Sequence, residues 1–203
     1  MDRHVHVGAV LVGGRSSRMG TPKHAMLMPD GRTMLQHVAA TLSQVARQVV
    51  AVGSRSIARD VGYPHIEDLR PDLGPLGGIE ALLAAANGGT LNGSEQFIIC
   101  PCDLPLISAQ TLELLTQSSE ALATVFRIEG CDVVQPMPAR LSAQVLPVVR
   151  RLLNSHQRSM AGLIAELNPH IVTLPAALLC QLHNVNERAD YEEAVRLLSD
   201  SPG

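Results

Sequence analysis

The chain has 203 residues, 46% of them hydrophobic, and a formal net charge of −3 from 16 lysines and arginines against 19 acidic residues. This balance excludes the basic footprint of a protein that binds a nucleic acid polymer, and two tyrosines, two phenylalanines and no tryptophan leave no aromatic platform for stacking single strands. No apolar run is long enough for a membrane span, and the first residues lack the apolar core of a secretory signal, so we expect no membrane partner.

Apolar runs typical of strands alternate with helical patterns along the chain, which predicts βαβ units around a mostly parallel sheet. Strands are expected at residues 5–12, 48–52, 65–68, 97–100, 131–135 and 170–174. Helices are expected at residues 33–45, 76–87, 108–115, 144–153, 158–167 and 189–198. The predicted fold class is therefore α/β, a Rossmann-like three-layer αβα sandwich. The length predicts one domain over residues 1–203, with two domains as the weaker alternative.

The first predicted strand runs directly into a loop that holds two adjacent glycines and three cations. Gly13 and Gly14 have no Cβ, so their backbone N–H groups can approach an anion closely. The cations Arg15, Arg18 and Lys23 suit phosphate oxygens. The spacing fits neither the Walker A loop nor the dinucleotide-binding Gly-x-Gly-x-x-Gly pattern. The loop is predicted to hold a polyphosphate; the alternative, a solvated cationic surface loop, leaves the adjacent glycines unexplained.

The most apolar predicted strand, at residues 97–100, leads into an aspartate. Asp103 lies just past its carboxyl end, at the edge of an open α/β sheet where ligands bind, and the glycine loop leaves the same edge. One carboxylate beside substrate phosphates is what Mg²⁺ uses in proteins. On position alone, a turn aspartate ahead of Pro105 is an equal alternative, and the neighbouring phosphate loop favours the metal.

Four cysteines in this aliphatic chain predict reduced thiols in a cytoplasmic protein: Cys100, Cys102, Cys131 and Cys180. Cys100 and Cys102 are a weak zinc signal, since no second pair or suitably spaced histidine accompanies them. Two small residues that finish a buried strand are the better interpretation.

Two further segments carry weaker signals. Asp68 precedes the turn at residues 74–78, Gly-Pro-Leu-Gly-Gly, whose backbone and following helix N-terminus can receive a nucleobase, with a bare turn as the alternative. Near the end of the chain, Asn186 is expected to cap the last helix, with Glu187 in its first turn. Asn184 is left for another role.

These segments, in this order, resemble the molybdenum cofactor guanylyltransferase family, and the resemblance spans most of the chain. The motifs that carry it are residues 11–20 with Lys23, residues 66–69 with 74–78, residues 100–107, and residues 184–186. Three positions depart from the family pattern, in which alanine, asparagine and histidine are usual: Val12, Val52 and Gln135.

The resemblance implies a fold of the nucleotide-diphospho-sugar transferase type and Mg²⁺-dependent transfer of GMP from GTP onto molybdopterin, with release of pyrophosphate. Such chemistry rests mainly on positioning and charge stabilisation. The implied catalytic residues are Lys23, Arg18 and Asp103, with Asp103 also the metal ligand. The implied GTP contacts are Leu11, Val12, Gly13, Gly14, Arg15, Lys23, Asp68, Gly74, Pro75, Leu76, Gly77 and Asp103. The resemblance places Asn184 and Asn186 on the acceptor side.

Two other functions remain open at this point. A cytidylyltransferase of the same cofactor, or another sugar-phosphate-type nucleotidylyltransferase, keeps the fold and changes the ligands; Gly13, Gly14 and the second motif favour guanine. A nucleotide-binding regulatory protein without turnover is the third reading, and it needs no pair such as Lys23 and Asp103. The expected partners are GTP, a molybdopterin-type small molecule and proteins of molybdenum cofactor biosynthesis, with no nucleic acid.

Overall fold

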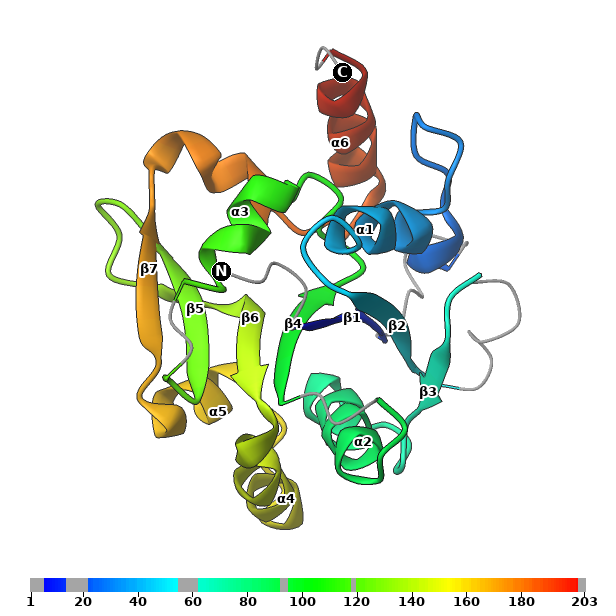
Figure 1. The fold of residues 1–203 in the computed structure, drawn as a ribbon. Helices are drawn as coiled ribbons and strands as arrows, with labels where there is room; N and C mark the ends of the chain where they lie inside the picture. The colour runs from blue at the N-terminus through cyan, green and yellow to red at the C-terminus, as the bar shows by residue number, and fades with distance from the viewer. Residues whose placement is uncertain (1–5, 14–21, 55–61, 92–94, 118–119, 201–203) are drawn as a thin grey trace.

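A computed structural model of the chain describes residues 6–13, 22–54, 62–91, 95–117 and 120–200, and Figure 1 shows their arrangement. Seven strands form one sheet in the order β3-β2-β1-β4-β6-β5-β7. The strands are β1 Val7–Val12, β2 Gln48–Gly53, β3 His65–Glu67, β4 Gln96–Pro101, β5 Ala123–Ile128, β6 Val134–Ser142 and β7 His170–Leu174. Strand β6 runs antiparallel to its neighbours β4 and β5, and the other pairings are parallel. The prediction of an α/β fold with a mostly parallel sheet is confirmed.

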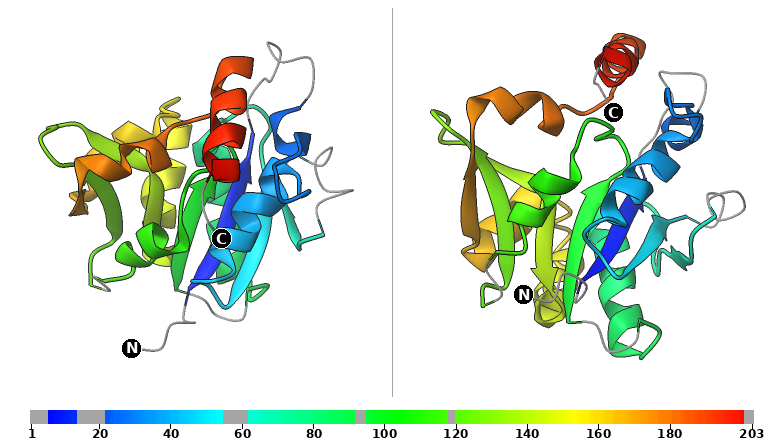
Figure 2. Two further views of the ribbon diagram at one scale, coloured as in Figure 1. Left: turned by 90° about the horizontal axis from the view of Figure 1, so that it is seen from above. Right: turned by 45° about the horizontal axis from the view of Figure 1, so that its top comes forward.

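Helices cover both faces of this sheet. The helices are α1 Met34–Leu42, α2 Pro75–Asn87, α3 Ala109–Leu114, α4 Leu146–Asn154, α5 Met160–Leu167 and α6 Arg188–Asp200. On one face lie α2, α4 and α5, and on the other lie α1 and α3, which gives three layers (Figure 1). Helix α6 stands apart from both faces, beside the segment that leads into α1 (Figure 2).

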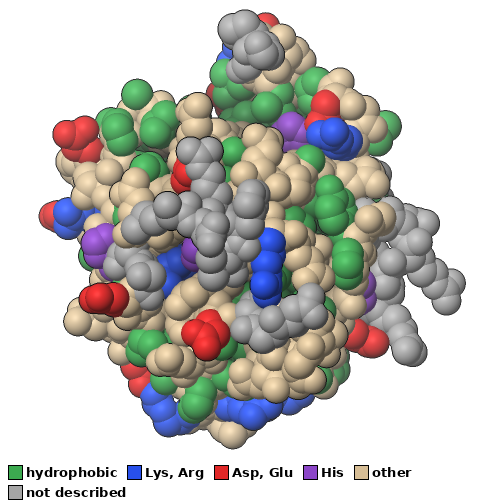
Figure 3. Space-filling model, in the orientation of Figure 1, with side chains coloured by type: hydrophobic (Ala, Val, Ile, Leu, Met, Phe, Trp, Pro, Cys, Tyr) green, Lys and Arg blue, Asp and Glu red, His purple; other side chains and the backbone are tan. Residues whose placement is uncertain are grey.

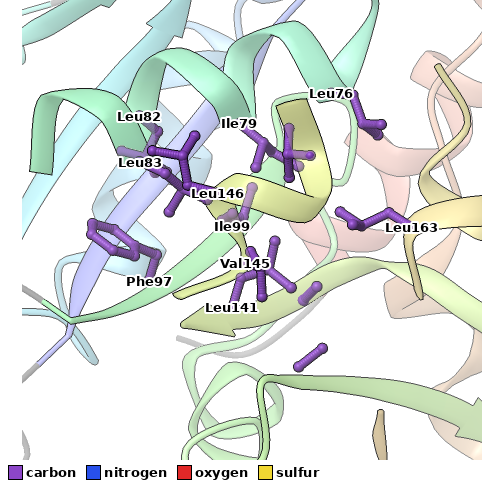
Figure 4. Packing of buried hydrophobic residues seen from close by; sticks show 14 of the residues in the cluster. Leu76, Ile79, Leu82, Leu83, Phe97, Ile99, Leu141, Val145, Leu146 and Leu163 are labelled. Atoms are coloured by element: carbon purple, nitrogen blue, oxygen red, sulfur yellow. The ribbon is translucent and has the colours of Figure 1, made fainter. Parts of the chain in front are cut away.

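Strand β1 shows how the core is built. Ala9 and Leu11 pack in the cluster that contains α2 and α4, whereas Val10 and Val12 pack in the cluster under α1 and α3. Figure 4 shows part of the first cluster, where leucine and isoleucine side chains of α2 meet Leu146 of α4. A strand covered on both faces is apolar at every position, which is why the continuous apolar runs predicted β1 and β4 correctly.

The second half of the sheet differs from the prediction. The sequence pattern predicts a strand at residues 131–135 and none at β5, whereas β5 is a full strand and β6 begins only at Val134. Pro136, Pro138 and Arg140 within β6 oppose an assignment to a buried strand. The structure tolerates Arg140 because Thr124 and Gln96 on the neighbouring strands accept its hydrogen bonds.

The predicted helices are confirmed with small changes at their ends. Helix α1 begins at a capping box, in which Thr33 and Gln36 each accept the backbone N–H of the other, and it ends at Leu42. Among the described residues, no helix combines the length and the apolar character that crossing a bilayer demands. On the face drawn in Figure 3, basic side chains are dispersed among acidic and neutral ones.

Candidate functional site

The carboxyl ends of β1 and its two neighbours meet at one edge of the sheet. The strand register sets Val12 beside Gly53 and Leu11 beside Pro101, so Gly13 and Asp103, which follow β1 and β4, share that edge. Strand β1 lies between β2 and β4, at the point where the strand order reverses. In open α/β sheets, ligands bind at such a switch point. The structure therefore brings the start of the glycine loop and the predicted metal ligand to the same place.

Lys23 is the only lysine in the chain, because the other 15 basic residues are arginines. Its Nζ lies 3.8 Å from Asp103 Oδ2 and donates a hydrogen bond of 3.0 Å to Asn186 Oδ1. The side chains of Lys23 and Asp103 are only 18% and 23% exposed. An ammonium held in this way is a fixed point charge of the kind that suits a phosphate oxygen.

Backbone hydrogen bonds hold Asp103 from two sides. Cys102 N donates to Leu11 O at 3.0 Å, which extends the pairing of β1 and β4 to the residue before the aspartate. Val185 N donates to Asp103 O at 2.8 Å, which ties the aspartate to the segment that precedes α6. The position of the carboxylate is thus set by the centre of the sheet and by the C-terminal part of the chain together.

The Asp103 carboxylate is incompletely paired. Burial raises its pKa, and the charge of Lys23 opposes that effect. Its Oδ1 atom is buried and has no hydrogen-bond partner among the described residues. Such an oxygen is costly when it stays unpaired, and a divalent cation relieves both the charge and the missing contact. The described ranges hold no group of three or more His, Cys, Asp or Glu that could by itself hold a metal ion.

The two cysteines before Asp103 belong to the core. Cys100 and Cys102 are both buried, at 0% and 6% exposure, and the four cysteines of the chain are free thiols. Burial, with the nearby Asp103 charge, raises the pKa of Cys102 to about 12. The interpretation of the two cysteines as small residues at the end of a buried strand is confirmed.

Asp68 and the turn before α2 form the second part of the edge. Asp68 Oδ1 is also buried without a partner in the described part of the chain, and burial raises the pKa of this carboxyl. Gly74 has a φ of +65°, which favours glycine, and Pro75 follows as the first residue of α2. An added Cβ at Gly78 would lie 3.3 Å from Leu11 Cδ2 and 3.5 Å from Asp68 Oδ1. The absence of a side chain at Gly78 therefore lets the backbone there lie close to Asp68 and β1.

Several of the residues predicted to contact the nucleotide can offer it backbone groups rather than side chains. The side chains of Leu11, Val12 and Leu76 are in the core, at 8%, 3% and 0% exposure, so a ligand at this edge meets their backbone groups. Gly13, in contrast, is exposed, and an added Cβ there would have nothing within 4 Å. Three further predicted residues lie outside the described ranges: Gly14, Arg15 and Arg18.

The segment before α6 departs from its prediction. Asp190, not Asn186, satisfies the start of the helix: its Oδ2 accepts the backbone N–H of Asn186 at 2.7 Å and of Glu187 at 2.9 Å. These bonds lower the pKa of Asp190. The prediction that Asn186 caps α6 is therefore wrong. Its side chain instead accepts the hydrogen bond from Lys23, which places this residue directly at the candidate site.

The side chain of Val185, between Asn184 and Asn186, is buried. A cavity of about 370 Å³ lies between the 3-10 helix Ala176–Leu182 and α6, and Val185, Leu106 and Ala194 are among the residues that line it. Asn184 and Asn186 do not line this cavity. The segment thus gives its apolar side chain to the cavity, whereas Asn184 and Asn186 are exposed and the Asn186 side chain contacts Lys23.

Comparison with known proteins decides which family this site belongs to. The profile of the MobA-like NTP transferase domain matches residues 8–185, which is most of the chain. The chain belongs to the MobA-like NTP transferase family. It is therefore a nucleotidyltransferase, and the resemblance inferred from the motifs is confirmed.

Relatives match the chain over nearly its whole length. A molybdenum cofactor guanylyltransferase from Xanthomonas euvesicatoria is 37% identical over 199 residues, which cover 96% of this chain and 95% of that protein. A probable molybdenum cofactor guanylyltransferase from Carboxydothermus hydrogenoformans is 29% identical over 197 residues, which cover 94% of this chain and 95% of that protein.

Solved structures of MobA-like and related proteins share the fold. Molybdopterin-guanine dinucleotide biosynthesis protein A from Archaeoglobus fulgidus has a TM-score of 0.74 at 20% identity, with 96% of this chain and 100% of that chain covered. A Mycobacterium tuberculosis protein, solved in complex with manganese, has a TM-score of 0.65 at 18% identity, with 94% and 97% covered. These similarities establish the nucleotide-diphospho-sugar transferase type of fold.

Proposed function

We propose that the protein transfers GMP from GTP onto molybdopterin and releases pyrophosphate. The observation that carries this proposal is the pair formed by Lys23 and Asp103 at the switch point of a MobA-like sheet. Relatives that match almost the entire chain bear the name of this activity. The proposal treats residues 1–203 as one catalytic domain, because the seven strands belong to a single sheet.

The reaction joins the terminal phosphate of molybdopterin to the α-phosphorus of GTP as the bond to pyrophosphate breaks. Lys23 places its charge beside that phosphorus and offsets the negative charge that builds up on its oxygens. The contacts with Asp103 and Asn186 hold the ammonium in position before substrate arrives. On the sequence motif alone, we assign Arg18 and Arg15 to the triphosphate, where they hold the leaving pyrophosphate.

Asp103 is proposed to hold Mg²⁺, which supplies charge neutralisation to the bound phosphates. The support is the buried Oδ1 atom that no described residue satisfies. A manganese complex of a structural neighbour is consistent with a divalent ion on this fold. A cation held by Asp103 would add its positive charge to that of Lys23, whose Nζ lies 3.8 Å from this carboxylate, where the reaction concentrates negative charge.

The nucleoside of GTP is assigned to the other part of the edge. The backbone of residues 11–14 is proposed to cradle the phosphates, and Asp68 to accept a hydrogen bond from the ribose. The turn formed by Gly74, Pro75, Leu76 and Gly77 is proposed to receive the guanine, because it offers backbone groups and the amino end of α2.

The acceptor is assigned to the side of the C-terminal segment. Asn186 touches Lys23, so an acceptor phosphate held by Asn184 and Asn186 would arrive next to the lysine that stabilises the reaction. Proteins that deliver molybdopterin are the macromolecular partners that such a reaction calls for.

The test is a pyrophosphate-release assay with molybdopterin, Mg²⁺ and each of the four nucleoside triphosphates. We expect GTP to be turned over fastest, and Lys23→Ala to lower kcat by about 10²–10³-fold with a smaller change in KM. Arg196→Ala, in an exposed pair with Asp200, is the charge-matched control and should leave kcat unchanged. Faster turnover of CTP would move the protein to the cytidylyltransferases. Absence of pyrophosphate with every nucleotide would leave a binding protein without turnover.

A further inference from the structure

A buried carboxylate in α2 binds the segment that leads into the turn assigned to guanine. Glu80 lies in α2 and is only 5% exposed. Its Oε2 accepts a hydrogen bond from Arg70 Nε at 2.9 Å and forms an ion pair with a terminal nitrogen of Arg70 at 2.8 Å. Arg150 Nε, from α4, lies 3.5 Å from Oε1. Glu80 is thereby paired with two arginines inside the protein and acts on these neighbours.

Arg70 connects Glu80 to the turn, because Arg70 lies in the chain between Asp68 and Gly74. Its remaining terminal nitrogen donates to Asn154 Oδ1 at 3.2 Å. A second support acts two residues later, where Arg158 donates to the backbone oxygen of Asp72 at 2.9 Å. The chain just before the turn is thus held at two points, Arg70 and Asp72, by residues of α2, of α4 and of the segment that follows α4.

The chain from Asp72 to Gly74 needs these contacts because its backbone dihedral angles are unusual. Asp72 and Gly74 both have positive φ, +58° and +65°, and a non-glycine residue such as Asp72 adopts this region only at a cost. A strained conformation persists when surrounding contacts over-determine it. Reading a base through backbone groups requires those groups to be placed to within about 0.5 Å.

We propose that Glu80, acting through Arg70, is a positioning residue that sets the preference of this site for guanine over adenine. The inference rests on the proposed function, in which the turn takes the base of GTP. GTP and ATP share the ribose and triphosphate, which the proposed function assigns elsewhere along the edge. A displaced turn therefore weakens the contacts that distinguish the two bases and leaves the shared contacts in place.

Two variants separate this role from general stability. Glu80→Gln keeps the shape but removes the charge that anchors Arg70. Arg70→Lys keeps the charge and loses the fork that reaches Oε2 with two nitrogens. Glu166→Gln is the matched control, because Glu166 pairs with Arg151 through an exposed contact between α5 and α4.

The measurement is the dissociation constant of GTP and of ATP, each with Mg²⁺, by titration calorimetry on folded protein. We expect Glu80→Gln and Arg70→Lys to weaken GTP binding by about tenfold or more, the size of one lost hydrogen bond, and to change ATP binding by less than about twofold. Glu166→Gln should change neither. If Glu80→Gln fails to fold, Arg70→Lys decides.

An unchanged ratio of GTP to ATP affinity in a folded Arg70→Lys protein would overturn the inference. Equal loss of affinity for both nucleotides would also overturn it, since that result indicates a purely structural role. Failure of the proposed function gives a different result, because the unmodified protein would then lack a preference for GTP at the outset.

Discussion

The two halves of the sheet differ in whether the protein itself satisfies the hydrogen-bonding groups of their buried charged side chains. At the carboxyl edge of β1 to β4, Asp68 and Asp103 each keep one buried oxygen without a partner among the described residues. In the other half, Arg140 on β6 is 0% exposed, and each nitrogen of its guanidinium donates a hydrogen bond, to Thr124, Gln96 or the backbone oxygen of Ala121.

The difference separates a ligand site from a structural network. Burying a polar group without a partner costs free energy, so native proteins pair such groups unless another component completes them. Arg140 is completed by the protein itself, and its burial needs no ligand. Asp68 and Asp103 are incomplete, and they lie at the edge of the sheet where Gly13 follows β1 and where Lys23 contacts Asp103. The comparison predicts that changes at the edge affect activity and changes around Arg140 affect stability.

The largest effect is expected at Asp103. Asp103→Asn keeps the shape of the side chain but removes the charge that holds a cation, and metal assistance contributes several kcal/mol to such reactions, so turnover should fall by about 10³-fold or more. The fold should be retained, because burial already disfavours the charged carboxylate. The check is pyrophosphate release together with thermal unfolding. Asp132→Asn, in the exposed connection between β5 and β6, is the control, and near-normal turnover by Asp103→Asn would show that Asp103 is only a turn residue.

A smaller effect, on stability alone, is expected around Arg140. Thr124→Val is isosteric and removes the oxygen that accepts two of the guanidinium hydrogen bonds. Because a hydrogen bond to a charged group contributes about 1.5–3 kcal/mol, the free energy of unfolding should fall by about 2–3 kcal/mol, with kcat unchanged. Urea unfolding measures the first quantity and the pyrophosphate assay the second.

Thr173→Val is the matched control for that prediction. Thr173 accepts a hydrogen bond from Arg127 at an exposed site, at 3.4 Å, so the same chemical change should alter stability by less than about 0.5 kcal/mol. Similar destabilisation by the two variants, or a loss of kcat in Thr124→Val, would break the contrast between the two halves of the sheet.

The smallest effect is a pH dependence at Asp68. Because burial raises the pKa of Asp68 in the folded protein, the folded state binds this proton more tightly than the unfolded state does. Stability therefore falls as the pH rises from the ordinary aspartate range through the raised value, and it stays at the lower level above it. Asp68→Asn does not titrate and should be more stable than the parent at neutral pH, with that advantage lost in acid. Melting temperatures over this range test it; an advantage that does not change with pH would contradict the cause.

Much of the fold and of the candidate site could be predicted from local sequence patterns, and the predictions that were wrong have identifiable physical reasons. The apolar runs of β1 and β4 are long enough to mark strands buried on both faces, and Asp103 follows directly from the second of them. Strand β6 could not be predicted, because the fitness of Arg140 for a buried strand depends on Thr124 and Gln96, which only the folded sheet brings near. The assignment of Asn186 failed because Asp190, an acid in the first turn of α6, competes for the same N–H groups.

The contacts of Lys23 also depend on distant parts of the chain. Lys23 and Asn186 are 163 positions apart in the sequence, and no spacing rule predicts their hydrogen bond. The support of the guanine turn by Glu80 and Arg70 is of the same kind. The glycines and the aspartates are local signals, whereas the groups that hold them in place come from tertiary structure.

Because Lys23 is the only lysine, amine-selective labelling tests the central claim most directly. Reductive methylation followed by mass spectrometry reports on this side chain, with the α-amino group as an internal control. The account predicts that GTP with Mg²⁺, at about a hundredfold excess over its Kd, slows methylation of Lys23 by about tenfold or more and leaves the α-amino group unaffected. Equal methylation of Lys23 with and without bound GTP would contradict the placement of the nucleotide phosphates at this edge of the sheet.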